Sequence, residues 1–411
     1  MGGLTPAPAD AVANPTRWER MPVAVRIGIL YIVARAVTTT FLLLAAALSS
    51  VGSRFGENAD IGTLMIGWDA QWYWFAAEHG YPAQLPITDG GDVAENQWAF
   101  MPVYAFLAKG LGFLLGSWGV AAVAIALVAG YLACLVLYRI VRMRADDATA
   151  TWATAFFAAA PLAALFQVGY AESLFLLWLF LALWMLQRRR YVWLYVLIPL
   201  MGFTRPGVLA FALLLGLYGI WRWATRRTEP LPVREIVHIC ALGLLAVVVG
   251  FSWQVLAAVV TGDPSAYLAT ELAWRRNWLG QSEGAFVPFD GFVQGAAFWF
   301  GSWGLGEITG YVVLAASVLG IAALLLFEPH VRRMGVEVRL WSAGYLLYLL
   351  AVFFPQSSIF RLLVPLSPLW GAVAMPRSAL WRVSVLVACL AGQWWWIYNM
   401  YALGNTYWQI P

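Results

Sequence analysis

Residues 23–48 read VAVRIGILYIVARAVTTTFLLLAAAL, a run whose only charged side chains belong to Arg26 and Arg35. A helix rises 1.5 Å per residue, so about 20 apolar residues cross the hydrocarbon core of a bilayer. Other apolar runs cover residues 120–140, 152–166, 174–186, 192–203, 208–220, 236–260, 310–327, 340–354, 362–374 and 383–403. The shorter runs fit a bundle if their outer ends line a water-filled cavity. We therefore predict an all-α polytopic membrane protein with about eleven transmembrane helices.

The composition excludes a string of soluble domains. The chain has 411 residues, of which 62% are hydrophobic and 11% are charged, whereas roughly 25% of a soluble domain is charged. The apolar runs are too long and unbroken for barrel strands, which alternate over about ten residues. Cys134, Cys240 and Cys389 lie inside apolar segments, which favours small core residues over disulfides or metal ligands. We expect one integral-membrane domain over residues 1–411.

The arginines predict the orientation of the helices. If residues 1–22 form a cytoplasmic N-terminal segment, most of the 25 basic residues fall on the cytoplasmic side, as the positive-inside rule requires. The first apolar run is too long for a signal-peptide core, so we expect it to be retained. This distribution of basic residues requires that residues 100–115 lie in the outer interface and do not cross the bilayer. The cytoplasmic arginines are then Arg17, Arg20, Arg26, Arg139, Arg142, Arg144, Arg188, Arg189, Arg190, Arg222, Arg226, Arg227, Arg234, Arg332, Arg333, Arg339, Arg377 and Arg382.

Two long external segments remain, at residues 49–117 and 261–307. They hold most of the acidic residues and many of the tryptophans, while the cytoplasmic loops are short. We therefore expect a multi-pass protein of the cell membrane that acts on its external, periplasmic face. The first segment would be a catalytic loop with interfacial helices, and the second would face an acceptor.

The catalytic loop contains the stretch GWDAQWYWFAAEHGYP at residues 67–82. Its body favours a helix, which Gly80 and Pro82 would end. Asp69 lies at the start of that helix, where its carboxylate either caps the helix or accepts a proton from an acceptor hydroxyl. Trp68 and Trp72 either stack on sugar rings or belong to an interfacial aromatic belt.

Three later stretches accompany this one: FMPVY at 100–104, GYAESLF at 169–175 and FTRPG at 203–207. Together, in this order, they resemble the motifs of the PIG-V-like mannosyltransferases, which belong to the C-type glycosyltransferase superfamily. The resemblance covers about residues 20–225 and continues faintly in FRLLVP at 360–365. Residues 83–97 and the segment after Thr261 match nothing in the family, so the resemblance leaves the acceptor open.

The resemblance implies an inverting transferase that moves mannose from polyprenyl-phosphate-mannose. The acceptor would be a hydroxyl of a lipid-linked or envelope glycan, and the partners would be membrane lipids, with no nucleic acid. Asp69 matches the family's catalytic base, and the departing lipid phosphate would need cationic stabilisation. The residues expected to contact the substrates are Trp68, Trp72, Tyr73, Glu78, Tyr104, Glu172, Arg275 and Arg276.

Three arginines depart from the inside rule, because Arg35, Arg205 and Arg361 lie within spans or at their outer ends. A charge at membrane depth costs about 2.5 to 3.5 kcal/mol on insertion scales, so each needs a partner. A guanidinium can bind a phosphate through two hydrogen bonds, which suggests the donor phosphate for Arg205 and Arg361. The alternative is an ion pair inside the membrane, with Glu172 as the partner. We expect Arg35 to be structural.

Other polar residues remain ambiguous. Glu172 could orient a sugar hydroxyl, act as a second acid or pair with Arg205. His79 could touch the donor phosphate or lie on the surface. Arg275 and Arg276, between two tryptophans, could bind an anionic acceptor headgroup or anchor the loop at the lipid surface.

No metal or other cofactor is expected, because the sequence has no DxD motif and no histidine cluster of ligand spacing. Asp89 and Asp92 are the conceivable metal pair, and a solvated turn explains them better. Two other classes of function stay open: a glycolipid flippase, although neither half of the chain mirrors the other, and a scaffold. Within the enzyme class, the sugar could also be arabinose or glucose.

Overall fold

The computed structural model describes residues 17–279, 286–404 and 410–411. Within these ranges the regular structure is helical, apart from one isolated antiparallel bridge between Ile87 and Val93. The predicted all-α class is confirmed. The predicted cytoplasmic segment, residues 1–22, lies mostly outside the described residues.

Five helices in the described part of the chain are long and apolar enough to cross a membrane. They are α2 (Val23–Ala47), α6 (Trp118–Arg142), α11 (Val233–Thr261), α14 (Glu307–Phe327) and α19, which continues into η5 (Ala379–Leu403). The protein is therefore a polytopic membrane protein.

The other predicted runs form shorter helices. These are α7 (Asp147–Ala158), α8 (Glu172–Gln187), η3 with α9 (Tyr191–Gly202), α10 (Val208–Ala224), α16 (Val336–Val352) and η4 with α18 (Val364–Ala374). The run at 152–166 differs most from the prediction. Its helix begins earlier, because the carboxylate of Asp146 caps it by accepting from Thr149 N at 2.8 Å, and it ends before Pro161.

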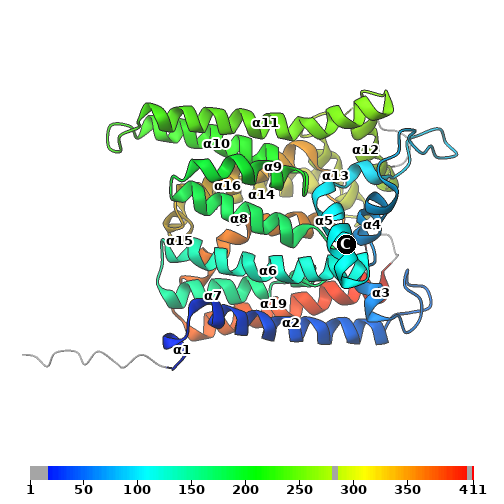
Figure 1. Cartoon of the computed structure of the whole chain (residues 1–411), viewed down its shortest axis with the longest axis horizontal. Helices are drawn as coiled ribbons and strands as arrows, with labels where there is room; N and C mark the ends of the chain where they lie inside the picture. Colours follow the sequence, from blue (N-terminus) through cyan, green and yellow to red (C-terminus); the bar gives the residue numbers. More distant parts are fainter. Residues whose placement is uncertain (1–16, 280–285, 405–409) are drawn as a thin grey trace, which may run out of the picture.

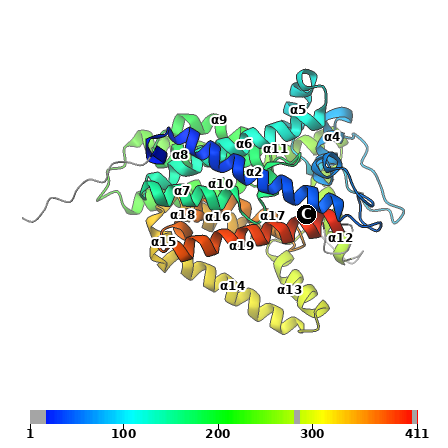
Figure 2. The ribbon, with the colours of Figure 1, turned by 90° about the horizontal axis from the view of Figure 1, so that it is seen from below.

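The long helices lie side by side along one axis, which is horizontal in Figure 1. The connections at one end include α1 (Arg17–Arg20) and α15 (Pro329–Arg333), and those at the other include α3 (Ile61–Met65) and α4 (Asp69–His79). Seen from below, α13 (Asp290–Ser302) and α14 diverge from the rest of the bundle (Figure 2). The bundle therefore has two distinct ends, and the first external segment is gathered at one of them.

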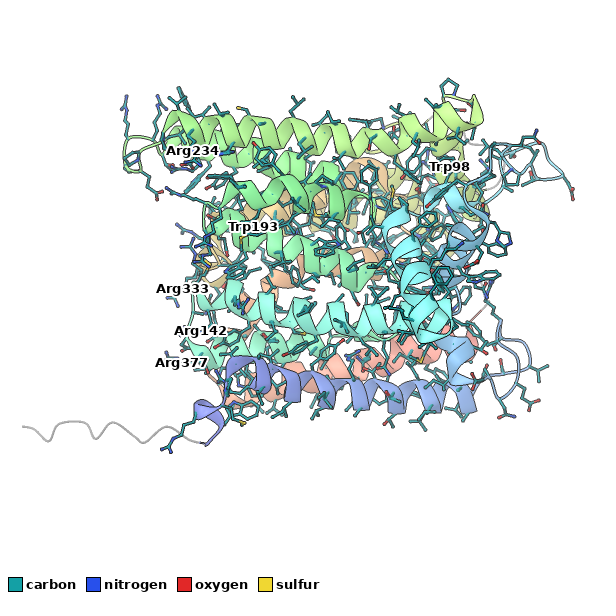
Figure 3. The ribbon with its side chains drawn as sticks, viewed as in Figure 1. Trp98, Arg142, Trp193, Arg234, Arg333 and Arg377 are labelled. Carbon is teal, nitrogen blue, oxygen red and sulfur yellow. The ribbon has the colours of Figure 1, made fainter. Side chains whose placement is uncertain are left out.

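Charge distinguishes the two ends. Arg142, Arg234, Arg333 and Arg377 lie toward the α1 end, whereas Trp98 lies toward the α4 end (Figure 3). This arrangement agrees with the charge pattern that placed the loops of the α1 end in the cytoplasm. On that prediction, which the labelling experiment below tests, we call the α1 end the cytoplasmic end and the α4 end the outer end.

Small residues let the central helices approach closely. Helix α6 buries Ala122, Ala126 and Ala133 completely in its contacts with neighbouring helices. A Cβ on Gly130 would lie 2.5 Å from the hydroxyl of Tyr31 on α2, so this contact requires glycine. Membrane interfaces favour such residues because apolar burial between helices in lipid supplies no driving force.

Arg35 also stabilises the centre of the bundle. Its guanidinium donates to the backbone carbonyls of Ala158 and Ala163, near the end of α7 and the start of η2 (Ala163–Phe166). Its side chain is buried. These contacts agree with the structural role that we predict for Arg35.

The segment predicted to lie in the outer interface, residues 100–115, forms α5 (Pro102–Leu115), which follows η1 (Gln97–Ala99). In Figures 1 and 2, α5 lies beside α4 at the outer end of the bundle. Phe113 and Leu114 on its last turn are exposed. This placement fits a helix that rests in the interface with an apolar tip toward lipid.

The topology can be tested by cysteine labelling. In a Cys240→Ala background, which removes the exposed native thiol, we expect Asp60→Cys, Gly90→Cys and Ser117→Cys to react with an impermeant reagent from outside. Arg333→Cys, at the cytoplasmic end, should react only after permeabilisation. Protection of position 117 alone would mean that α5 crosses the bilayer and that the later helices are inverted.

Candidate active site

The outer end positions Asp69 through a tight turn. Trp68 precedes α4 with a φ of 52°, a left-handed conformation that a bulky side chain rarely adopts. Its indole N–H donates to Met400 O at 3.0 Å, so the C-terminal segment holds this turn in place. Asp69 follows as the first residue of α4. Strained backbone of this kind is often found at functional sites.

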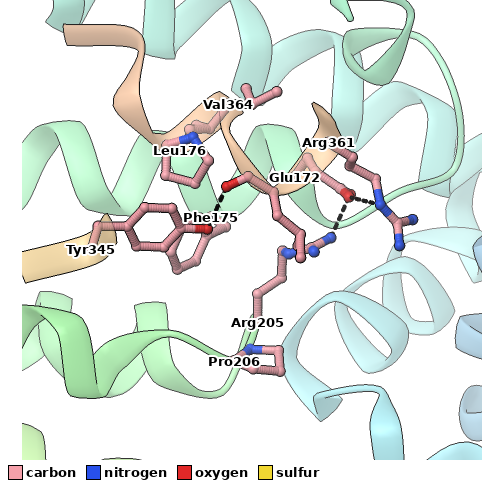
Figure 4. Close-up of a pocket in the computed structure, with 10 residues that line it drawn as sticks. Glu172, Phe175, Leu176, Arg205, Pro206, Tyr345, Arg361 and Val364 are labelled. Atoms are coloured by element: carbon pink, nitrogen blue, oxygen red, sulfur yellow. Dashed lines mark hydrogen bonds and ion pairs between the residues drawn. The ribbon is translucent and has the colours of Figure 1, made fainter. Parts of the chain in front are cut away.

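Four charged side chains meet beside this turn, and we call them the charge cluster: Asp69, Glu172, Arg205 and Arg361. They come from α4, from α8, from the connection between α9 and α10, and from α17 (Ile359–Leu362). Arg361 pairs with Asp69 through its Nη1 and lies 3.4 Å from Glu172 Oε1 through its Nε. Arg205 pairs with the same oxygen of Glu172 (Figure 4). Two acids therefore neutralise two bases.

The members of the charge cluster differ in accessibility. The side chain of Asp69 is 19% exposed, whereas that of Glu172 is 5% exposed. Arg361 also lies over the ring of Tyr170, at 5.5 Å from its centroid. Asp69 is thus the acid that a substrate can reach, and Glu172 is the acid that positions both guanidinium groups.

Burial acts against the charge of Asp69. It raises the pKa of the Asp69 carboxyl, and neighbouring Glu172 raises it further, while Arg361 and Arg205 act in the opposite direction. A carboxyl whose pKa is raised is a stronger base than an ordinary exposed aspartate.

A small cavity lies behind the charge cluster, among Glu172, Arg205, Arg361 and Tyr345 (Figure 4). Its volume is about 20 Å³, which is room for about one water molecule. A phosphosugar does not fit there, so a substrate would approach from the side of Asp69.

The predicted aromatic contacts divide into two groups. Trp68, Tyr73 and Tyr104 are buried, and the hydroxyl of Tyr104 donates to Ala122 O at 2.9 Å. The structure gives these three side chains a packing role, which differs from the substrate contact that we predict for them. Trp72 is half-buried and stacks on Phe100 at 5.9 Å, so it keeps a surface for a substrate.

Glu78 and His79 lie at the other end of α4 and are exposed. Glu78 pairs with Lys109 at 3.5 Å, and the ring of His79 packs against Trp74 and Phe75. The ten-residue separation from Asp69 corresponds to about 15 Å along the helix. His79 therefore lies on the surface, away from Asp69, and its contact with the donor phosphate stays a prediction.

Arg275 and Arg276 lie on α12 (Ala266–Leu279), within the predicted acceptor-side loop. Arg275 lies 3.9 Å from Asp290 and faces the ring of Phe354, and Arg276 donates to Val93 O. Both side chains connect α12 to other external segments. An additional contact with an anionic acceptor stays a prediction.

Glu271 is an acid that the sequence analysis did not single out. It lies on α12, and burial raises its pKa to about 7, with Tyr267 and Arg205 opposing that shift. The sequence offered one sign of it: Glu271 is an isolated acid shortly before Arg275 and Arg276, in a segment with many aromatic residues.

No group of three or more His, Cys, Asp or Glu side chains that could hold a metal lies in the described ranges. Asp89 is exposed and Asp92 is half-buried, in a turn where Gly91 N donates to Thr88 O at 2.9 Å. The chemistry that the charge cluster offers is proton acceptance by Asp69 and anion binding by Arg361 and Arg205.

Comparison of the sequence with known protein families and with curated proteins gave no match. Among solved structures, the chain is similar to an oligosaccharyltransferase of Archaeoglobus fulgidus in complex with Zn and sulfate, with a TM-score of 0.47 and 14% identity. It is also similar to ArnT from Cupriavidus metallidurans bound to undecaprenyl phosphate, with a TM-score of 0.48 and 15% identity.

The first comparison covers 93% of this chain and 53% of the other, and the second covers 88% and 62%. This chain therefore spans between about half and three-fifths of those proteins. With TM-scores below 0.5, these likenesses assign no function to it.

Glu172 should prove essential for stability. Replacing it with Gln leaves Arg205 without its carboxylate partner, and breaking a buried ion pair in this way costs about 3 to 5 kcal/mol. The free energy of unfolding in detergent micelles measures this loss. Glu78→Gln, which removes an exposed partner of Lys109, should change that free energy by less than about 1 kcal/mol. Equal stability of the two variants would contradict a structural role for Glu172.

Proposed function

We propose that this protein is a membrane glycosyltransferase of the C-type superfamily that uses a polyprenyl-phosphate sugar. The observation that carries the proposal is the contact between Asp69 and Arg361 at the outer end of the bundle. It combines a proton acceptor and a phosphate-binding cation beside a half-buried tryptophan, Trp72. The motifs around Asp69, Glu172 and Arg205 support the same assignment.

The proposed reaction is a single displacement with inversion. The acceptor hydroxyl attacks the anomeric carbon, the bond from that carbon to the phosphate oxygen breaks, and Asp69 takes the hydroxyl proton. The lipid phosphate leaves with the bonding electron pair, and Arg361 stabilises its charge. Arg205 adds a second cation, and Glu172 keeps both guanidinium groups in place.

Donor binding would require an exchange of anions. Arg361 pairs with Asp69 in the structure described above, so the donor phosphate would replace that carboxylate on the guanidinium. The exchange frees Asp69 to accept a proton from the acceptor hydroxyl. One guanidinium thus couples donor binding to release of the base.

We propose mannose as the sugar, because of the motif resemblance, and an external glycan or glycolipid as the acceptor. The reaction would occur at the periplasmic face of the cell membrane and require no metal. The test is sugar transfer by the purified full chain in lipid nanodiscs. Synthetic polyprenyl-phosphate mannose, glucose and arabinose would be compared, with extracted envelope lipids as acceptors. Movement of the lipid-linked sugar across the bilayer without transfer would favour a flippase.

Asp69→Asn should lower kcat by about 10² to 10⁴, the usual contribution of general-base catalysis. The substitution keeps the shape of the side chain but removes one of the two carboxylates that contact Arg361. The thermal unfolding midpoint should therefore fall, and kcat is measured at a temperature well below that midpoint.

Asp60→Asn is the matched control, because Asp60 is exposed in the same external segment and caps α3 by accepting from Thr63 N at 3.2 Å, a role that asparagine also fills. This control should transfer sugar at the wild-type rate. Normal turnover of the Asp69 variant would leave Asp69 with a structural role only, as the ion-pair partner of Arg361.

The rate should also depend on pH through Asp69. A base works only when it is deprotonated, so kcat/KM should fall as the pH drops through its pKa. Because burial raises that pKa, the midpoint of the acid limb should lie above the ordinary value of 3.8. A midpoint at or below 3.8, or an unchanged acid limb in Asp69→Asn, would exclude Asp69 as the titrating base.

Arg361→Lys should bind the donor more weakly and turn over more slowly, but it should retain more activity than Arg361→Ala. Lysine keeps the charge and loses the planar fork of the guanidinium. Loss of one group that stabilises the developing anion lowers kcat by about 10² to 10³. Donor affinity and single-turnover rates separate the two effects. Equal activity of the lysine, alanine and wild-type proteins would show that the phosphate binds elsewhere.

A further inference from the structure

A second cavity lies at the cytoplasmic end of the bundle and takes no part in the proposed reaction. It lies between η3, which precedes α9, and the start of α11, and its volume is about 420 Å³. That volume is in the range of small-molecule sites, roughly 300 to 1,000 Å³. Residues from the two sides of the cavity include Arg189, Arg190, Trp193, Arg234 and His238.

Two residues that line this cavity, Tyr191 and Glu235, belong to a polar network. Arg222 is fully buried and donates to both oxygens of Glu235, at 2.7 and 3.2 Å. The hydroxyl of Tyr191 donates to the same carboxylate at 2.8 Å, and its ring stacks on His238 at 5.7 Å. Glu235 is thereby fully engaged by the protein itself.

The remaining charges do not balance. Glu229 pairs with Arg189 and with Arg222, the latter at 3.1 Å. Arg190 and Arg234 are exposed, and within the described ranges neither side chain has a hydrogen bond or an ion pair. Four guanidinium groups therefore share two carboxylates, and two positive charges face the cavity without a counter-ion from the described chain.

The rim of the cavity is apolar. Val192 and Trp193 line it and are exposed. Val196 and Val237 do not line the cavity, but they are exposed on α9 and α11, next to the segments that do. Arg234 and Trp193 both lie in the half of the bundle away from Trp98 (Figure 3). A tryptophan beside exposed valines is typical of the boundary between headgroups and acyl chains. Soluble phosphate would leave this rim unused, whereas acyl chains would cover it.

We propose that this cavity binds the phosphate of an anionic phospholipid headgroup from the cytoplasmic leaflet. Arg190 and Arg234 would bind the phosphate oxygens, and the acyl chains would lie along Val192, Trp193, Val196 and Val237. Basic cavities between helices on this side of a membrane suit such headgroups. The proposal does not depend on the reaction at the outer end.

Native mass spectrometry of the full chain in detergent micelles tests the site. Phosphatidylglycerol should bind more tightly than phosphatidylcholine, and the double variant Arg190→Gln/Arg234→Gln should lose about 30-fold in affinity for phosphatidylglycerol. The matched control is Arg332→Gln/Arg333→Gln, which removes two exposed arginines at the same end of the molecule. The control should bind phosphatidylglycerol as the wild type does. Equal losses in both variants would indicate diffuse surface attraction and overturn the proposal.

Inorganic phosphate distinguishes the two sources of a phosphate group. If the acyl chains contribute as proposed, phosphate alone should not displace phosphatidylglycerol. Displacement at concentrations near those of the lipid would overturn the lipid assignment in favour of a soluble phosphate site.

The wild-type protein provides a test that does not depend on the stability of a variant. A phosphatidylglycerol probe with a photoreactive group near its headgroup should label peptides that contain residues 188–193 or 232–238. The corresponding phosphatidylcholine probe should label them less. Labelling spread evenly over exposed segments, with no difference between the two probes, would overturn the proposal.

Discussion

Pairing of charges in a medium of low polarity is the constraint on which the outer end of this protein depends. Each member of the charge cluster comes from a different segment, and an isolated charge at that depth would be unfavourable by several kcal/mol. The ion pairs of Arg361 and Arg205 with Asp69 and Glu172 therefore fix α4, α8, α17 and the turn before α10 relative to one another. The small residues of α6 allow this convergence by letting the neighbouring helices approach.

The same pairing suits the chemistry that we propose. A guanidinium that already holds a carboxylate can exchange it for a phosphate without passing through a state in which it is unpaired. The two carboxylates differ in how easily a phosphate could replace them, because the side chain of Glu172 is buried while that of Asp69 is partly exposed. Asp69 is thus the carboxylate that can leave Arg361. In the proposed reaction it becomes available as a base only after the donor has bound, so it does not take a proton from water before that step.

Hydropathy and charge predict most of the architecture, because both depend on short stretches of sequence. Every predicted apolar run contains a helix, although the run at 152–166 is interrupted after Ala158, and α5 lies beside α4 as expected. The possible pairing of Arg205 with Glu172 also follows from the need of a buried charge for a partner. The pairing of Arg361 with Asp69 could not be predicted. The two residues are 292 positions apart, so the spacing of residues within a single helix says nothing about their contact. The burial of Tyr104 and the raised pKa of Glu271 likewise depend on tertiary packing.

The two ends of the bundle treat positive charge in opposite ways, and their surroundings explain the difference. At the outer end, acids of the protein neutralise Arg205 and Arg361. This arrangement suits the function that we propose, because a site that binds and releases an anion needs a replaceable partner in its resting state. At the cytoplasmic end, Arg190 and Arg234 have no carboxylate partner within the described chain, although Glu229 and Glu235 lie close by. A surface that faces anionic headgroups needs no acid of its own there, since the membrane supplies the counter-ion. A carboxylate added beside Arg234 would compete with that lipid, just as Asp69 competes with the donor phosphate for Arg361.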